Sequence, residues 1–132
     1  MREINLRTER KTQLVEITRD VQQAVADANG ASAALVYVPH TTAGVTIQEH
    51  ADPAVARDLE AAMERMVGED WGWEHVEAGE QNAPAHVRAA LAGPQVLVPL
   101  DGPRLALGTW QGIFFCEFDG PRSRKVYVTP LR

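Results

Sequence analysis

The sequence predicts a single α+β domain with mostly antiparallel strands and two to three helices. Segments with strand character stand at both ends of the 132-residue chain, and helical segments lie between them. The two kinds of segment do not alternate regularly, as they would in a doubly wound fold. No linker, low-complexity tract or repeat array divides the chain, so residues 1–132 form one domain, long enough to bury a substantial core.

The first three elements follow from alternation and capping signals. Residues 2–8 and 12–17 alternate apolar and polar side chains, which predicts a pair of strands. Residues 19–29 carry an apolar stripe at helical spacing. Thr18 is suited to cap this helix and Gly30 to end it.

Two further strands, 32–38 and 44–48, flank a polar loop, and the next helix has the clearest end signals in the chain. Asp52 is its expected N-cap, Pro53 fits the first helical position, and Gly68 follows the last turn. Helical spacing predicts that one stripe of this helix is buried, formed by Val55, Leu59, Ala62, Met63 and Met66.

The C-terminal half begins with an aperiodic stretch, 69–82, which predicts a long loop. A short helix over 84–92 follows and ends at Gly93. Four apolar runs separated by turn residues then predict an antiparallel meander, at 95–100, 104–109, 112–118 and 125–129. The tetrapeptide Asp-Gly-Pro-Arg occurs in two of these turns, where Gly and Pro are ordinary turn residues, so neither copy by itself indicates a binding site.

Composition excludes several classes of protein. A net charge of −5 and a pI near 5.3 argue against nucleic-acid binding, and no apolar stretch is long enough to cross a membrane. The charged N-terminus does not resemble a signal peptide. A single cysteine, Cys116, fits a reducing compartment, so we expect a cytoplasmic protein. The small basic cluster of Arg122, Arg124 and Lys125 is sufficient to hold one phosphate group.

Histidines provide the first candidate for chemistry. His40 follows a strand directly, in a loop with Thr41 and Thr42, and strand ends commonly carry functional groups. His75 lies in the long aromatic loop. His86 lies in the first turn of the short helix, where the helix dipole favours a neutral ring. Three converging imidazoles would match a zinc site with one open position, but no spacing motif fixes that geometry, and three unrelated surface histidines are the alternative.

The apolar run Gly108–Phe118 contains a second candidate. Alternation places Glu117 on one face with Ile113 and Phe115, where a carboxylate needs a partner or a shifted pKa. We expect either a general acid–base or a structural ion pair, with Arg122 as the partner. Cys116, on the opposite face, reads as a small core residue rather than a nucleophile.

Three more residues have weaker signals. Asp58 borders the apolar stripe of its helix and points either toward the His40 loop or into solvent. Trp71 and Trp73 are suited to cover a planar substrate or to form a subunit contact.

Taken together, these residues resemble the YjbQ-like family over nearly the whole chain. The similarity rests on the runs His40-Thr-Thr-Ala-Gly-Val-Thr-Ile, Gly108-Thr-Trp-Gln-Gly-Ile and Glu117-Phe-Asp-Gly-Pro-Arg122. It includes, at matching spacing, Glu49, Ala51, Asp52, Pro53, Asp58, His75, Asn82, Ala85, His86 and Gly93. His50 departs from the motif, so it is left out of the candidate site.

The resemblance implies a compact α+β sandwich that assembles as a homotrimer, with pockets near the subunit contacts. It also implies a secondary, weak thiamine-phosphate synthase activity. The family pattern assigns His40, His75 and His86 to the polar core of the pocket, where a divalent metal (Zn or Mg) or a phosphate would bind. Around them it assigns a further set of side chains: Glu49, Asp58, Asn82, Gln111, Glu117 and Arg122, with Thr41 and Thr42 in support.

Three functions follow as hypotheses. The first is an enzyme acting on a small phosphorylated substrate, in which the histidines, Arg122 and the tryptophans neutralise a leaving pyrophosphate and stack flat rings. The second is a metal-dependent hydrolase that uses the three histidines to activate water, with Glu117 or Glu49 as the base. The third is a non-catalytic trimer that binds a small anion or a metal.

Overall fold

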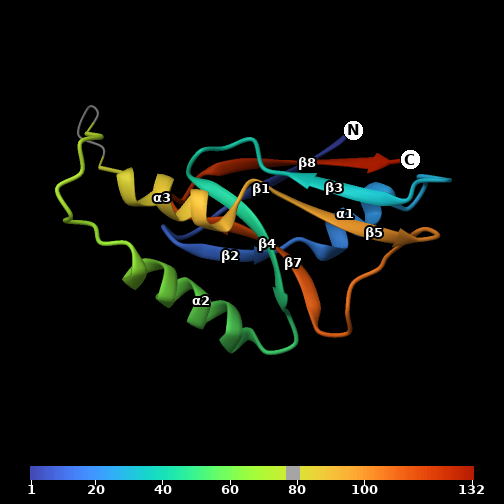
Figure 1. Cartoon of the computed structure of the whole chain (residues 1–132), viewed down its shortest axis with the longest axis horizontal. Helices are drawn as coiled ribbons and strands as arrows, with labels where there is room; N and C mark the ends of the chain where they lie inside the picture. The colour runs from blue at the N-terminus through green and yellow to red at the C-terminus, as the bar shows by residue number, and fades with distance from the viewer. Residues whose placement is uncertain (77–80) are drawn as a thin grey trace.

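The computed structural model describes residues 1–76 and 81–132, and its strands form two antiparallel sheets (Figure 1). The larger sheet has the strand order β1-β8-β3-β5-β6, and the smaller has the order β2-β7-β4. Three helices complete the domain, which confirms the predicted α+β class. The strands are β1 (Arg2–Arg7), β2 (Gln13–Glu16), β3 (Ala33–Tyr37), β4 (Ala43–Glu49), β5 (Gln95–Asp101), β6 (Arg104–Leu105), β7 (Gln111–Glu117) and β8 (Ser123–Leu131); the helices are α1 (Thr18–Val25), α2 (Pro53–Met66) and α3 (Ala83–Ala92).

Strand pairing differs from the expected order. β1 pairs with β8, whereas β2 pairs with β7, so the first two strands belong to different sheets and the predicted strand pair is wrong. The predicted C-terminal meander is also wrong, because β7 enters the small sheet between β2 and β4. Short-range alternation identifies strands, but it does not tell which of two packed sheets a strand joins.

The main core lies between the two sheets and is closed by α1. Val21 and Val25 of α1 pack with Val36 of β3 and with Phe115 of β7, all fully buried. The helix is shorter than predicted and ends at Val25. Its N-cap is Ile17, so Thr18 is not the cap. The Thr18 hydroxyl instead donates to Glu16 Oε2 and accepts from the amide of Ile113.

β7 is buried on both faces, as its composition predicts. Ile113 and Phe115 face the main core, whereas Cys116 and Phe118 form a second cluster with Ala85 and Ala89 of α3. Burial raises the pKa of the Cys116 thiol to about 12, which confirms Cys116 as an unreactive core residue.

The start of α2 is as predicted, but its buried stripe is not. Asp52 caps the helix by accepting from the amide of Ala54 at 2.9 Å. The one fully buried residue of α2 is Glu60. Of the expected stripe, Val55, Leu59 and Met63 are half-buried, with Met63 packed against the second cluster, whereas Ala62 and Met66 are exposed. Glu60 pairs with Arg10 at 3.0 and 3.1 Å and accepts from the amide of Leu14, which ties α2 to the edge of the small sheet.

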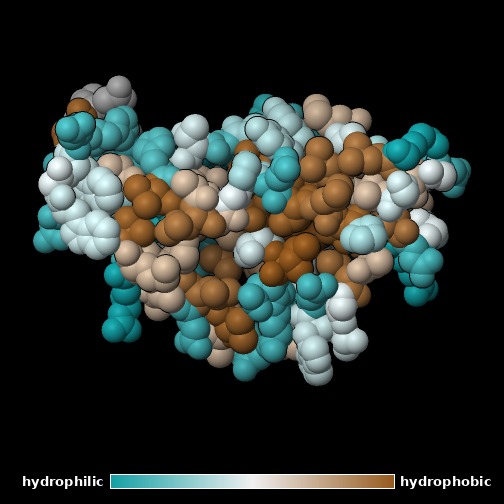
Figure 2. All heavy atoms as spheres, viewed as in Figure 1, coloured by the Kyte–Doolittle hydropathy of each residue, from teal (hydrophilic) through white to brown (hydrophobic). Residues whose placement is uncertain are grey.

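The outer face of the large sheet carries an apolar surface that none of the described helices covers. Leu35 stands opposite Leu97 on β5, and Tyr37 stands opposite Tyr127 on β8. Leu97 is 59% exposed and Tyr37 40%. Hydrophobic residues also gather in Figure 2 over the region where Figure 1 places β3 and β5, and again beside α2 and α3.

None of the described helices has the length and hydropathy needed to cross a bilayer.

Candidate functional site

His40 lies where the chain leaves the large sheet for the small one. β3 ends at Tyr37, Pro39 stops the strand, and β4 begins at Ala43. His40 Nε2 accepts a hydrogen bond from the backbone amide of Lys125 at 3.0 Å. An amide can only donate, so Nε2 is unprotonated and the neutral ring carries its proton on Nδ1. Partial burial and the nearby charge of Arg124 lower the pKa of His40, which keeps the ring neutral.

A buried ion pair between Glu117 and Arg124 lies next to this loop. Glu117 is completely buried, and its two carboxylate oxygens accept from Nε and Nη2 of Arg124. The hydroxyl of Thr8 donates to Oε1 at 2.7 Å, and the amide of Asp119 donates to Oε2 at 3.0 Å. Burial opposes ionisation, but these four donors hold the pKa of Glu117 below its usual value. The structure thus favours the ion-pair interpretation of Glu117.

Arg124 joins the ion pair to the His40 loop. Its Nη2 donates to the hydroxyl of Thr42 at 2.8 Å. The third nitrogen, Nη1, has no hydrogen-bond partner among the described residues and is not sealed from solvent. Arg124 also lines a cavity of about 550 Å³ beside the loop. The other lining residues are Tyr37, Val38, Pro39, His40, Thr41, Thr42 and Pro94.

The same network extends to the start of α3. Asn82 donates to Asp119 Oδ2 at 3.1 Å, and that oxygen also accepts from Arg122 Nη2 at 2.8 Å. Thr8 then links the backbone amide of Arg122 to Glu117. Asn82, Glu117, Arg122 and Thr42 are therefore brought together as predicted site residues, although the expected Glu117–Arg122 ion pair is wrong. Glu117 pairs with Arg124, and Arg122 pairs with Asp119.

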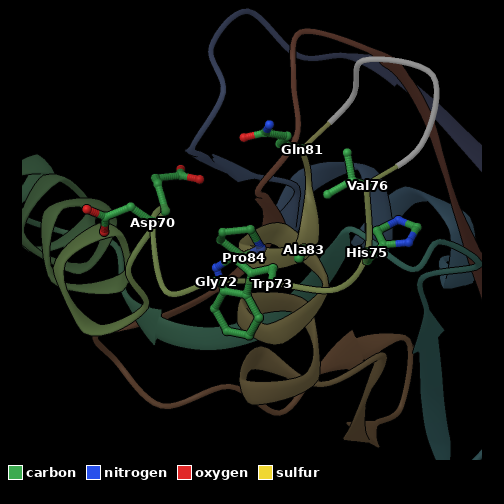
Figure 3. Close-up of a pocket in the computed structure, with 9 residues that line it drawn as sticks. Asp70, Gly72, Trp73, His75, Val76, Gln81, Ala83 and Pro84 are labelled. Atoms are coloured by element: carbon green, nitrogen blue, oxygen red, sulfur yellow. The ribbon is translucent and has the colours of Figure 1, made fainter.

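A second cavity, of about 260 Å³, lies beside the aromatic loop (Figure 3). Trp73 and His75 line it together with Asp70 and Pro84, and the imidazole of His75 contacts His86 edge-on with ring centroids 5.0 Å apart. Trp73 stacks on Trp71 at 5.8 Å and donates to the carbonyl of Gly68 at 2.9 Å. Residues 77–80 of the predicted loop lie outside the described part of the chain.

The three histidines do not form a metal centre within one chain. Among residues 1–76 and 81–132 there is no group of three or more His, Cys, Asp or Glu side chains placed to hold a metal. His75 and His86 contact each other, whereas His40 has its Nε2 occupied by Lys125. Within the described part of the chain, His40 is therefore not joined to His75 and His86 in a set of metal ligands.

Three other predicted residues lie away from Glu117. Gln111 and Glu117 are the two ends of β7, and Glu49 pairs with Gln111, so Glu49 and Glu117 are about 20 Å apart at the usual rise per residue. The Glu49 carboxylate accepts from the amide of Asp52, and the Gln111 side chain accepts from the amide of Gly108. Asp58 is exposed on α2.

Sequence reasoning missed Thr8 and Asp119 of the network. It placed Arg124 in the basic cluster suited to a phosphate, but it did not identify Arg124 as the partner of Glu117. A signal for Arg124 is present in the chain, because it precedes Val126 and Val128 in a strict alternation that places all three on the buried face of β8. A buried arginine in that register requires a buried carboxylate nearby.

Fold and site together define a class of protein: a two-sheet α+β sandwich in which a buried Glu–Arg pair supports a loop histidine beside an open cavity. The chain belongs to the YjbQ-like UPF0047 family, whose model matches residues 2–132. It is 42% identical over 131 residues to the UPF0047 protein YugU of Bacillus subtilis, covering 97% of this chain and 96% of that protein.

Solved structures agree with this assignment. A YjbQ/UPF0047 family protein from Clostridium acetobutylicum superimposes with a TM-score of 0.93 at 41% identity, covering 99% of this chain and all of the other. A Sulfolobus solfataricus protein, described as YbjQ-like and of unknown function, gives a TM-score of 0.89 at 32% identity, covering 96% and 92%. These relatives establish the family and the fold, and they leave the activity to be argued from the site.

Proposed function

We propose that this protein is a small enzyme that acts on a phosphorylated substrate and holds the phosphate group in the cavity beside His40. One observation carries the proposal: two potential donors line the same cavity, namely His40, whose neutral ring carries its proton on Nδ1, and Arg124, whose Nη1 has no hydrogen-bond partner among the described residues. Phosphate oxygens accept hydrogen bonds from both groups, and a bond from a guanidinium is among the stronger kinds. The polar residues of the loop, Thr41 and Thr42, line the same space.

The arrangement favours an anion over a metal at His40. A metal bound at Nε2 would have to displace the amide of Lys125, which would then lose its partner. The positive charges of Arg124 and Lys125 next to the ring also oppose a bound cation. The metal-dependent hydrolase is therefore the weaker hypothesis for this cavity.

We further propose that the active unit is a homotrimer in which neighbouring chains complete the site. The uncovered apolar surface on β3, β5 and β8 begins at Tyr37, which also lines the His40 cavity. A second copy packed on this surface would lie at the mouth of the cavity. That arrangement gives Glu49, Asp58, Gln111, His75 and His86 of a neighbouring chain a route to the site that they lack within one chain.

The reaction that we propose is a weak transfer of the thiamine-phosphate synthase type. The bond between the pyrimidine-methyl carbon and the pyrophosphate oxygen breaks and leaves its electron pair on the pyrophosphate, and the thiazole nitrogen supplies the pair for the new C–N bond. His40 and Arg124 would stabilise the charge on the leaving group. Because Glu117 is committed to Arg124, Thr8 and Asp119, it positions the arginine and does not exchange protons with the substrate.

Product formation tests this proposal. Purified wild-type protein should convert the pyrimidine-methyl pyrophosphate and the thiazole phosphate into thiamine phosphate slowly, and it should complement a thiamine auxotroph when overexpressed. His40→Leu should lose most of the activity, whereas Asp27→Asn, which removes only an exposed ion pair with Arg2, should retain it. Phosphate binding without any turnover would instead favour a non-catalytic anion-binding trimer.

A further inference from the structure

Glu16 and His50 meet across the middle strand of the small sheet. Glu16 is the last residue of β2 and His50 follows the last residue of β4, and these two strands flank β7 on opposite sides. His50 Nδ1 lies 2.6 Å from Glu16 Oε2, so the two side chains span the full width of the sheet. Both side chains are about one-third exposed.

The strand between them has a glycine at the crossing point. A Cβ atom on Gly112 would lie 2.8 Å from Glu16 Oε2 and 2.8 Å from His50 Cβ, closer than such atoms approach in proteins. Any side chain at position 112 would therefore hold the two residues apart. The missing side chain of Gly112 is what lets the pair close over β7.

Both members of the pair are held by further hydrogen bonds. Glu16 Oε2 accepts from the Thr18 hydroxyl at 2.8 Å, and that hydroxyl accepts from the amide of Ile113. The backbone amide of His50 donates to the carbonyl of Trp110 at 2.9 Å. Glu16 is thus fixed to the start of α1, and His50 is fixed to the turn before β7.

We propose that Glu16 and His50 form a latch that closes over Gly112 and fixes the corner between β4 and α2. The corner contains Glu49, whose carboxylate accepts from the amide of Asp52, and Asp52, which caps α2. With the latch closed, the end of β4 and the first turn of α2 are held against β7. With it open, this corner separates from the small sheet while the buried network around Glu117, at the far end of β7, stays intact. The latch goes beyond the proposed function and does not depend on it.

Amide hydrogen exchange of the intact protein tests the latch. His50→Leu and Glu16→Leu should each speed exchange at the amides of His50, Ala54 and Val55 by about tenfold, the effect of losing one charge-assisted hydrogen bond. The amide of Val45, bonded to Gly93 at the opposite end of β4, should be unchanged. The double variant should exchange no faster than Glu16→Leu alone, because that variant already removes the contact with His50 together with the bond from Thr18.

His50→Asn provides the conservative control, since its side-chain nitrogen keeps a donor near the position of Nδ1 and should preserve slow exchange. Unchanged exchange in both leucine variants, or additive effects in the double variant, would overturn the latch. Equal loss of protection in His50→Asn and His50→Leu would also overturn it. Phosphate binding at the His40 cavity should be the same in all of these variants, so failure of the latch and failure of the proposed function are separate results.

Discussion

At the scale of single residues, the site depends on a charge pair whose carboxylate is completely buried. Glu117 has no exposed surface, and every donor around it is used to keep it ionised. Removing water from such a pair costs several kcal/mol per ion, so the pair contributes little net free energy to folding. Its main effect is to fix the position of the Arg124 side chain. It holds Arg124 against Thr42, at the wall of the cavity beside His40.

Replacing one member of the pair should be costly. Glu117→Gln leaves the buried guanidinium of Arg124 without its counter-charge, so we expect a loss of about 3–5 kcal/mol in the free energy of unfolding. Urea denaturation measures it. Glu3→Gln is the matched control, because Glu3 forms an exposed pair with Lys125 at 3.8 Å and should cost less than about 1 kcal/mol. Similar losses in both variants would show that Glu117 is not buried as an ion.

The pH dependence of stability follows from His40. Its pKa is lowered in the folded protein from the ordinary value of 6.5, so between that value and the folded one the unfolded state binds more protons. This contribution to stability is complete above pH 6.5 and declines as the pH falls below it. His40→Gln keeps an acceptor for the Lys125 amide but does not titrate.

Thermal unfolding of the wild type and His40→Gln in phosphate-free buffer, from pH 7.5 to pH 5.5, tests this sign. The melting temperature of the wild type should fall more over this range than that of the variant. A wild-type melting temperature that rises relative to the variant would contradict a lowered His40 pKa.

At the scale of elements, polar contacts hold α2 in addition to the packing of Met63 against the second core cluster. Arg88 of α3 is buried, and its guanidinium donates to the carbonyls of Met63, Glu64 and Val67 at the C-terminal end of α2. These carbonyls have no partners within the helix, and a cation there also complements the helix dipole. Glu60 fixes the other side of the same helix to Arg10.

Arg88→Met should therefore loosen α2. Methionine fills much of the buried volume but leaves three carbonyls without a donor, so we expect a loss of about 2–4 kcal/mol in the free energy of unfolding. Arg65→Met, on the exposed side of the same helix, is the control and should change stability by less than about 0.5 kcal/mol. Chemical denaturation measures both. Equal effects would contradict a capping role for Arg88.

The elements also show how far sequence can predict this fold. Capping signals gave the start of α2 at Asp52, and alternation gave the two buried faces of β7, because both depend on neighbours in the chain. The partition of strands into two sheets was not predictable, since β1 and β2 have the same local pattern. The partner of Glu117 was missed for a similar reason: Arg122 is nearer in the chain, but only Arg124 has the register that points into the core.

At the scale of the whole molecule, the apolar outer surface of the large sheet is where we propose that copies of the chain pack together. Leu97 and Tyr37 are exposed in a single copy, next to Leu35 and Tyr127. Uncovered surfaces of this kind usually mark contacts between proteins. In the homotrimer that we propose, the remaining predicted site residues would reach the site from a neighbouring chain. The sequence of one chain does not tell where a second copy packs, so this part of the site geometry was not predictable from it.

Leu97→Glu should dissociate the proposed homotrimer. A charge placed at the centre of an apolar contact loses its hydration without gaining a partner, so we expect monomers at micromolar concentration. Sedimentation velocity measures the change. Leu91→Glu, on α3, has the same exposure of 59% outside the large sheet and should leave the assembly intact. A monomeric wild type, or a trimeric Leu97→Glu, would contradict the proposed interface.

The most direct test of the phosphate site is an NMR titration of ¹⁵N-labelled protein with inorganic phosphate and pyrophosphate. The amide of Lys125 and the ring nitrogens of His40 should shift with saturable dependence on ligand, and in His40→Leu the binding should weaken by at least about tenfold, while His50→Leu binds as the wild type does. Shifts confined to residues outside the His40 cavity, or unchanged affinity in His40→Leu, would contradict the account.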